Sequence, residues 1–187
     1  MPPYEENHEA VGYSLPNIKM RIVDDNLNNL GPGEVGELLI TGPNVMRGYK
    51  ENPEANKNTF VDGWLKTGDV AKVDETGMVW IVDRLKELIK VKGYQVPPAE
   101  LESVIKEHPD VIDAAVLGVP HPTTGETPKA FVVLKQGSNA NKEQIISFID
   151  ERVAAYKRVN EVQIVDSVPK SPSGKILKNV LREMYLK

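Results

Sequence analysis

Short apolar segments of strand length, each followed by a turn signal, fill the first part of the chain. Residues 18–23 and 37–41 are such segments, and a stretch rich in glycine and proline separates them. Residues 70–73 and 78–82 flank the sequence Asp-Glu-Thr-Gly at 74–77, which predicts a hairpin because glycine adopts a positive φ without steric cost. Such a succession of short strands and turns predicts a small barrel or a curled sheet.

The second part of the chain interleaves strands with helices and shows no regular strand–helix–strand repeat, which favours the α+β class. The strands expected there are 87–91, 94–96, 112–118, 129–135 and 162–165, and the helices are 99–107, 142–156 and 175–185. We expect a domain boundary near 83–86. Residues 1–83 then form a small β-barrel subdomain, and residues 84–187 form an α+β domain with a three-stranded antiparallel sheet, helices and a β-hairpin.

Composition excludes several classes of protein. The chain has no cysteine, so it has no disulfide framework, thiolate zinc site or cysteine nucleophile. His8, His108 and His121 lie far apart and in no metal-ligand spacing, so we expect no metal site. The net charge of −4 provides no general attraction for nucleic acid. No apolar run approaches the roughly 20 residues of a membrane span, and the start resembles no signal peptide, so we expect a cytoplasmic protein without a membrane span.

Two segments imitate nucleotide-binding loops. Residues 31–36 match the G-x-G-x-x-G pattern, but Gly36 leads into a strand instead of a helix, so a turn is the better interpretation. Residues 171–175, Ser-Pro-Ser-Gly-Lys, lack the first glycine of a Walker loop and have Ile176 where serine or threonine is required. What remains is Lys175 at the end of a polar loop and the start of a predicted helix. Its ammonium could approach an anionic ligand, or it could be a solvated surface lysine.

The tripeptide Thr67-Gly68-Asp69 also has two interpretations. It places a carboxylate just before a predicted strand, and a carboxylate accepts hydrogen bonds from the two adjacent hydroxyls of a ribose. The alternative is an aspartate that caps a turn. The tripeptide alone does not decide between them.

Six segments taken together are more specific than any one of them. They are Gly36-Glu37-Leu38-Leu39-Ile40-Thr41-Gly42, Gly48-Tyr49, Gly63-Trp64-Leu65-Lys66-Thr67-Gly68-Asp69, Asp83-Arg84-Leu85-Lys86-Glu87-Leu88-Ile89-Lys90, Lys92-Gly93-Tyr94-Gln95-Val96 and Pro169-Lys170-Ser171-Pro172-Ser173-Gly174-Lys175-Ile176. In order and spacing they resemble the acyl-adenylate-forming superfamily over nearly the whole chain. The segment 83–90 looks most like the branch of 4-coumarate–CoA ligase, luciferase and fatty acyl-CoA ligase.

The resemblance implies a fold and a reaction. In that family a large N-terminal adenylation domain ends in a small β-barrel, here 1–83, and a hinge joins it to a mobile C-terminal α+β domain, here 84–187. The implied enzyme is an AMP-forming acyl-CoA ligase, which uses Mg²⁺, ATP and CoA to convert a carboxylate into an acyl-CoA, AMP and pyrophosphate. An acyl-adenylate is the intermediate.

The resemblance also assigns roles to residues that bind the nucleotide and move the domain. Asp69 matches the residue that binds the ribose hydroxyls of AMP, and Arg84 matches the one that supports ribose or phosphate. Lys86 matches the hinge residue. Lys175 matches the catalytic lysine of adenylation, in which the substrate carboxylate attacks the α-phosphate of ATP and pyrophosphate leaves.

A second group of matching residues belongs to the thioester step. Lys90 and Gln95 match catalytic positions that assist around the phosphate and the acyl carbonyl. Lys92, Gly93 and Tyr94 form the turn beside which the pantetheine arm of CoA passes, and a Cβ at Gly93 would narrow that channel. Lys178 and Asn179 depart from the family, which commonly has an arginine pair there, and Asp83 replaces a common glycine.

The family's phosphate loop, adenine motif and acyl pocket are absent from this sequence. We therefore expect a truncated piece of the ligase that is inactive alone, requires no cofactor by itself and has the missing N-terminal domain as its partner. One alternative is a split-gene subunit, or a module that binds CoA or a protein partner. Another is a piece of a peptide-synthetase adenylation domain.

Overall fold

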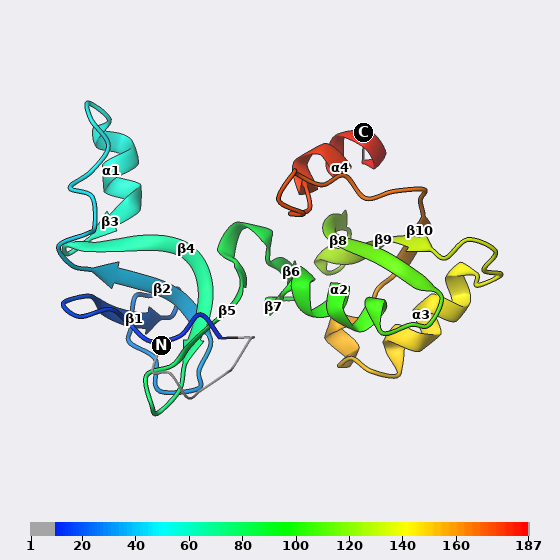
Figure 1. The fold of residues 1–187 in the computed structure, drawn as a ribbon, viewed down its shortest axis with the longest axis horizontal. Coiled ribbons are helices and arrows are strands. Elements are labelled where there is room, and N and C mark those ends of the chain that lie inside the picture. The colour runs from blue at the N-terminus through cyan, green and yellow to red at the C-terminus, as the bar shows by residue number, and fades with distance from the viewer. Residues whose placement is uncertain (1–9, 187) are drawn as a thin grey trace. The chain divides into compact units, whose positions relative to one another are not determined.

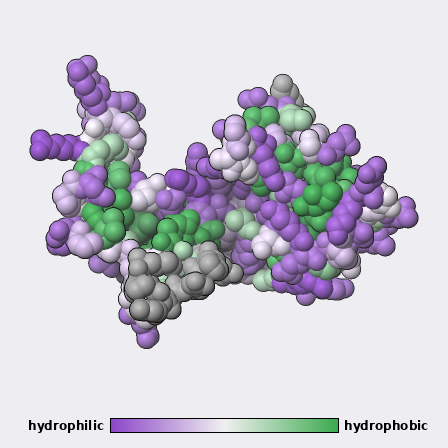
Figure 2. All heavy atoms as spheres, viewed as in Figure 1, coloured by the Kyte–Doolittle hydropathy of each residue, from purple (hydrophilic) through white to green (hydrophobic). Residues whose placement is uncertain are grey.

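The structure is a computed structural model that describes residues 10–186, and its chain divides into two compact units (Figure 1). The first unit is 1–86 and the second is 87–187. The division follows Lys86, which lies within the range 83–86 where the sequence placed the boundary and three residues after the end of the segment 1–83. Figure 2 shows hydrophilic residues over most of the visible face of each unit. Within residues 10–186, no helix is long and apolar enough to cross a membrane.

The first unit is built on one antiparallel sheet. Its strands are β1 (Lys19–Val23), β2 (Gly36–Thr41), β3 (Phe60–Val61), β4 (Trp64–Val73) and β5 (Val79–Arg84). The order is β1-β2-β4-β3, and β5 also pairs with β4. Irregular pairing along β4 marks bulges, which increase the bend of a strand, and Figure 1 shows β4 strongly bent. Of the two forms that the sequence suggested, the pairings of residues 10–86 describe a curled sheet.

The first unit also contains a helix that the sequence analysis missed, α1 (Pro53–Thr59). The side chain of Asn52 caps it by accepting a hydrogen bond from the N–H of Ala55 at 3.0 Å. The cap followed by a proline is a recognisable start signal. No residue of α1 is buried, so the helix has no apolar stripe that would indicate it in the sequence.

The second unit is a sheet with helices on both faces. Its strands are β6 (Ile89–Val91), β7 (Tyr94–Val96), β8 (Val111–His121), β9 (Gly125–Leu134) and β10 (Glu161–Ile164), and its helices are α2 (Pro98–Lys106), α3 (Lys142–Asp150) and α4 (Lys178–Tyr185). The order is β10-β9-β6-β7, and β8 also pairs with β9. The predicted α+β class is confirmed.

Two details of the predicted sheet are wrong. Strand β10 pairs parallel to β9, not antiparallel, because α3 lies between them in the chain and carries it back to the end of the sheet where β9 begins. The β6–β7 hairpin is not separate from the sheet, since Val91 of β6 pairs with Gly125 of β9. The sheet therefore has five strands instead of three.

Several predicted boundaries also differ. The polar stretch 120–128 was expected to be a loop, but β8 and β9 stay paired as far as His121 and Gly125. The helix expected over 142–156 ends at Asp150, and a separate 3₁₀ turn, Ala155–Lys157, follows it. The last helix begins at Lys178 instead of Lys175.

Both faces of the β8–β9 pair are buried. Ala114 and Val116 belong to one apolar cluster with Leu101 of α2 and Ile149 of α3. Their neighbours in the strand, Ala115 and Leu117, belong to a second cluster with Leu181 of α4. Successive side chains of a strand point to opposite faces, so α2 and α3 cover one face of the sheet and α4 covers the other.

The start of α3 gives a test of the fold. The Asn141 side chain accepts from the N–H of Gln144 at 2.9 Å, and the Gln144 side chain accepts from the N–H of Asn141 at 2.9 Å. Asn141→Ala removes one bond of this capping box, and we expect it to lower the free energy of unfolding by about 1 kcal/mol, measured by urea denaturation. Asn139→Ala, at an exposed residue of the preceding loop, is the control. Equal stability of both variants would contradict the role of the cap.

Candidate functional site

Asp69 and Arg84 form an ion pair in the first unit. They lie opposite each other on β4 and β5, and the Arg84 Nε lies 2.8 Å from the Asp69 Oδ1. The Arg84 guanidinium also donates to the carbonyl of Thr67 at 3.4 Å. Asp69 lies within β4, not before a strand, because β4 already pairs with β3 from Trp64 onward. The β4–β5 hairpin therefore brings two of the predicted site residues into contact.

The geometry of this pair leaves acceptor capacity at Asp69. Its side chain is 22% exposed, and among residues 10–186 its Oδ2 has no hydrogen-bond partner. A carboxylate oriented by an arginine through one oxygen can accept a hydroxyl proton through the other. Asp69 is therefore suited to accept hydrogen bonds from the hydroxyl groups of a ligand. The Arg84 guanidinium is available to an anionic group near those hydroxyls.

Lys86 lies in a short 3₁₀ turn, Leu85–Glu87, at the division between the two units. The residue is exposed, and this turn buries none of its side chains. No side chain of this turn is therefore anchored in a core at the predicted hinge position.

Lys90 and Gln95 lie directly opposite each other in the β6–β7 hairpin, and both are exposed. Residues paired in this way present their side chains on the same face of the sheet. The N–H of Lys90 donates to the Glu126 carboxylate at 2.8 Å, which holds this end of the hairpin to β9. The structure thus brings these two predicted residues together.

Lys92 and Gly93 form the tight turn of this hairpin, with φ of 50° and 86°. Two positive φ values are typical of the type I′ turn, and glycine adopts them without strain. A Cβ at Gly93 would meet no atom of this chain within 4 Å, so within the chain it is the backbone conformation that favours glycine here.

Tyr94, next to this turn, stacks on Tyr156. The ring centroids are 4.6 Å apart and the rings are inclined by 23°. Lys157 follows Tyr156 and forms an ion pair with Glu100 of α2 at 2.6 Å. Sequence reasoning missed Tyr156 because it placed the residue inside a long helix. No local signal in the sequence indicates the stack, which joins residues far apart in the chain.

Lys175 lies on a closed turn. The N–H of Ser171 donates to the Lys175 carbonyl at 2.8 Å, and the N–H of Gly174 donates to the Ser171 carbonyl at 2.9 Å. The Ser171 hydroxyl accepts from the N–H of Lys175 at 3.2 Å, and Lys170 pairs with Ile176. The Lys175 side chain is exposed and forms no ion pair within residues 10–186. Its ammonium is available to an external anion.

The predicted residues of the second unit form two groups. One is the hairpin with Lys90, Gln95 and the turn, and the other is the turn that carries Lys175. No hydrogen bond or ion pair between described residues joins Lys175 to Lys90 or Gln95. Within residues 10–186, no group of three or more His, Asp or Glu side chains is placed to hold a metal.

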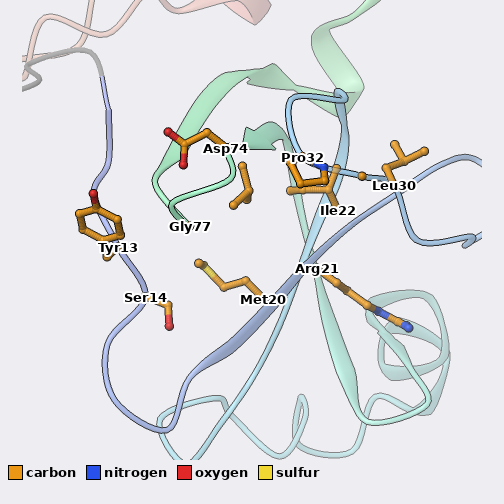
Figure 3. A pocket seen from close by; sticks show the side chains of 11 residues that line it. Tyr13, Ser14, Met20, Arg21, Ile22, Leu30, Pro32, Asp74 and Gly77 are labelled. Atoms are coloured by element: carbon orange, nitrogen blue, oxygen red, sulfur yellow. The ribbon is translucent and has the colours of Figure 1, made fainter.

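A hollow that the sequence did not predict lies on the first unit (Figure 3). It has a volume of about 560 Å³ and is lined mainly by Tyr13 and Ser14, by β1, by the turn after Asn29 and by the hairpin turn between β4 and β5. Tyr13 and Met20 flank it, whereas Arg21 points away from Tyr13 (Figure 3). None of the predicted site residues lines this hollow.

Two family models match segments of this chain. Residues 100–175 match the family model described as AMP-binding enzyme C-terminal domain. Residues 1–50 match the one described as AMP-binding enzyme. The chain belongs to the acyl-adenylate-forming family of AMP-binding enzymes. The resemblance read from the six sequence segments is confirmed.

Curated members of this family extend well beyond the present chain. The chain is 46% identical to 4-coumarate–CoA ligase 3 of Oryza sativa subsp. japonica, over 96% of this chain and 33% of that relative. It is 47% identical to 4-coumarate–CoA ligase-like 6 of Arabidopsis thaliana, over 95% of this chain and 32% of that relative. The chain therefore spans about a third of the length of these AMP-binding enzymes.

Solved structures of the family have the same fold. ATP-bound MatB from Rhodopseudomonas palustris is 40% identical, with a TM-score of 0.88, and the match covers 95% of this chain and 36% of that protein. The o-succinylbenzoate CoA synthetase of Bacillus subtilis, in complex with its acyl-adenylate intermediate, is 35% identical, with a TM-score of 0.81 and the same coverage.

The turn between β4 and β5 shows a pKa shift outside the predicted site. The Thr76 hydroxyl donates to the Asp74 carboxylate at 2.7 Å, and backbone N–H groups add to it, so the pKa of Asp74 is lowered. Asn28 lowers the pKa of Asp24 in the same way, in the turn after β1. Both aspartates belong to turns, and neither is a predicted site residue.

We expect Thr76→Ala to raise the pKa of Asp74 toward its usual value, because the largest cause of the shift is lost. Titration of the Asp74 carboxyl carbon by NMR measures it. Since the folded-state pKa is lowered, the carboxylate stabilises the fold above the unfolded pKa, and this contribution is lost as the pH falls through the folded pKa. Thr76→Ser keeps the hydroxyl and should keep the shift, so a pKa raised equally in both variants would contradict this cause.

Proposed function

We propose that this chain is the C-terminal third of an AMP-forming acyl-CoA ligase. The observation that carries the proposal is Lys175, exposed at the end of a closed turn, without an ion pair among the described residues and within the segment that matches the AMP-binding C-terminal domain. The 4-coumarate–CoA ligases among the relatives support the reaction class. Substrate choice belongs to the acyl pocket, for which this sequence has no residues.

In the first half-reaction the substrate carboxylate attacks the α-phosphorus of ATP, and pyrophosphate leaves. Negative charge gathers on the phosphate oxygens, and the Lys175 ammonium stabilises it. Asp69 accepts hydrogen bonds from the ribose hydroxyls, and Arg84 orients Asp69 through their ion pair. Mg²⁺ would neutralise phosphate charge in the intact enzyme, and no residue of this chain is assigned to it.

In the second half-reaction the CoA thiol attacks the acyl carbonyl of the adenylate, and AMP leaves. We assign Lys90 and Gln95 to the phosphate and the acyl carbonyl, because they project from the same face of the hairpin. The turn of Lys92, Gly93 and Tyr94 borders the path of CoA. Between the two steps, a domain rotation about Lys86 moves the Lys175 turn away from the reacting groups and brings this hairpin to them.

A second acceptor is also proposed. The amide bond synthetase McbA from Marinactinospora thermotolerans is 37% identical to this chain, with a TM-score of 0.83. The adenylate could therefore be transferred to an amine instead of CoA. Product analysis with CoA and with amines, offered separately, distinguishes the two.

The missing N-terminal domain is the proposed partner of this chain. ATP and AMP as ligands are supported by the family and by the ATP-bound neighbour, and CoA is a proposal. We also propose a cytoplasmic location. The competing location is the peroxisome, because one relative is named a peroxisomal ligase. Fluorescence microscopy of the tagged full-length protein would separate the two locations.

The activity is tested by joining the upstream two thirds of the rice 4-coumarate–CoA ligase to this chain. We expect the fused protein to catalyse ATP–pyrophosphate exchange with carboxylates, and the chain alone to show none. Lys175→Ala should lower exchange by about 10²- to 10³-fold, because it removes a charge placed at the developing negative charge. Lys135→Ala, at another exposed lysine, is the control. Exchange by the chain alone, or unchanged exchange in Lys175→Ala, would overturn the proposal.

The hinge is tested in the same fused protein. Lys86→Pro fixes φ at this position and restricts the preceding residue, so we expect the thioester step to slow by about tenfold or more while adenylation changes little. Lys86→Ala keeps the backbone freedom and should leave both steps near the wild-type rate. Single-turnover measurements of each half-reaction decide, and equal losses in both would count against a hinge at Lys86.

A further inference from the structure

A largely buried ion pair lies at the start of α4, just after the turn that carries Lys175. Glu102 of α2 is 8% exposed, and its Oε1 accepts from the N–H of Val116 in β8 at 3.0 Å. The same oxygen lies 3.2 Å from the Nζ of Lys178, and the two side chains are 11% and 13% exposed. One carboxylate therefore joins a helix, a strand and the beginning of α4.

The stability of α4 alone does not explain this pair. Lys178 is the first residue of α4, where a positive charge opposes the helix dipole. The helix has no side-chain cap at Leu177 and no acidic residue in its first turn. A lysine at this position is unfavourable for the helix in isolation, so what the pair provides is attachment of the helix start to α2 and β8.

The attachment reaches the Lys175 turn through a short piece of backbone. Lys178 follows Lys175 by three residues, and the N–H of the intervening Leu177 donates to the Pro169 carbonyl at 2.8 Å. Lys170, on the opposite side of the turn, forms an ion pair with Asp113 of β8 at 2.6 Å. Both ends of the turn are thus held at its base by carboxylates of the α2–β8 region.

The two ion pairs differ in how much they contribute to stability. The Lys170 side chain is 40% exposed, and exposed ion pairs contribute little. The Glu102–Lys178 pair is removed from water on both sides, and loss of one partner would leave the other as an unpaired charge in that environment. The buried pair is therefore the dominant attachment.

We infer that Glu102 is a positioning residue for adenylation, acting through Lys178 to set where the Lys175 turn presents its ammonium. The inference rests on the proposed role of Lys175. Glu102 touches no reacting atom. It fixes the base of the turn, so the free side chain of Lys175 samples a smaller volume around the phosphate position. Small displacements of a catalytic group cost rate steeply.

Four variants isolate the ion pair. Glu102→Gln keeps an oxygen for the N–H of Val116 but removes the charge, and Lys178→Met keeps the aliphatic stem. Lys178→Arg keeps the positive charge and can keep the ion pair with Glu102. Glu161→Gln is the matched control, because it removes the partner of another largely buried lysine, Lys129, at 2.8 Å between β9 and β10.

Amide hydrogen exchange tests the attachment without requiring activity. In the 187-residue chain and in the fused ligase, we expect Glu102→Gln and Lys178→Met to speed exchange at the amide of Leu177 by about tenfold, since the hydrogen bond to Pro169 opens more often. Lys178→Arg and Glu161→Gln should stay within about twofold of the wild type. Unchanged exchange in Glu102→Gln would overturn the attachment.

Half-reaction kinetics of the fused ligase test the positioning. We expect Glu102→Gln and Lys178→Met to lower kcat for ATP–pyrophosphate exchange by about ten- to a hundredfold, with KM for ATP little changed. Thioester formation from preformed acyl-adenylate should stay near the wild-type rate, and Lys178→Arg should recover most of the exchange.

A merely structural effect would lower the rates of both half-reactions together. That outcome, or an unchanged rate of ATP–pyrophosphate exchange in Glu102→Gln, overturns the inference. Absence of adenylation by the wild-type fused protein contradicts the proposed function instead. The amide exchange at Leu177 still decides the attachment in that case, so the two failures are distinguishable.

Discussion

The pairing of β8 with β9 is the constraint on which the rest of the second unit depends. The two strands pair from Val111 opposite Leu134 to His121 opposite Gly125, and both faces of the pair are buried. Each face therefore needs its own cover, and α2 with α3 supply one while α4 supplies the other. The turn that carries Lys175 leads directly into α4, so its position follows from the burial of Leu181 on the second face.

The same strand pair also carries the polar attachments of the candidate site. Asp113 and the N–H of Val116 both belong to β8, and they meet Lys170 and Glu102. Glu126 of β9 holds the N–H of Lys90 in the neighbouring hairpin. A central sheet buried on both faces moves little, so groups fastened to it are well suited to hold flexible segments in place. The hairpin of Lys90 and Gln95 and the turn of Lys175 are thus both fastened to this sheet by polar contacts.

The fold was predicted best where a local pattern decides it. The starts of α2 and α3 were predicted to within one residue, because a helix start depends on residues only a few positions apart. The helix α1 was missed because it buries nothing. The parallel direction of β10 was missed because it follows from how α3 packs, and no residue of β10 records that direction.

The sequence by itself determined the α+β class, the family and the identity of the candidate residues, because these depend on local periodicity and on ordered short segments. Only the tertiary structure decided which of them meet. It stacked Tyr94 on Tyr156 and placed Glu102 beside Lys178 at the start of α4. Each of these contacts joins segments that are far apart in the chain. They meet only after the strands have paired and the helices have covered the apolar faces of the sheet, and no local sequence pattern specifies that pairing.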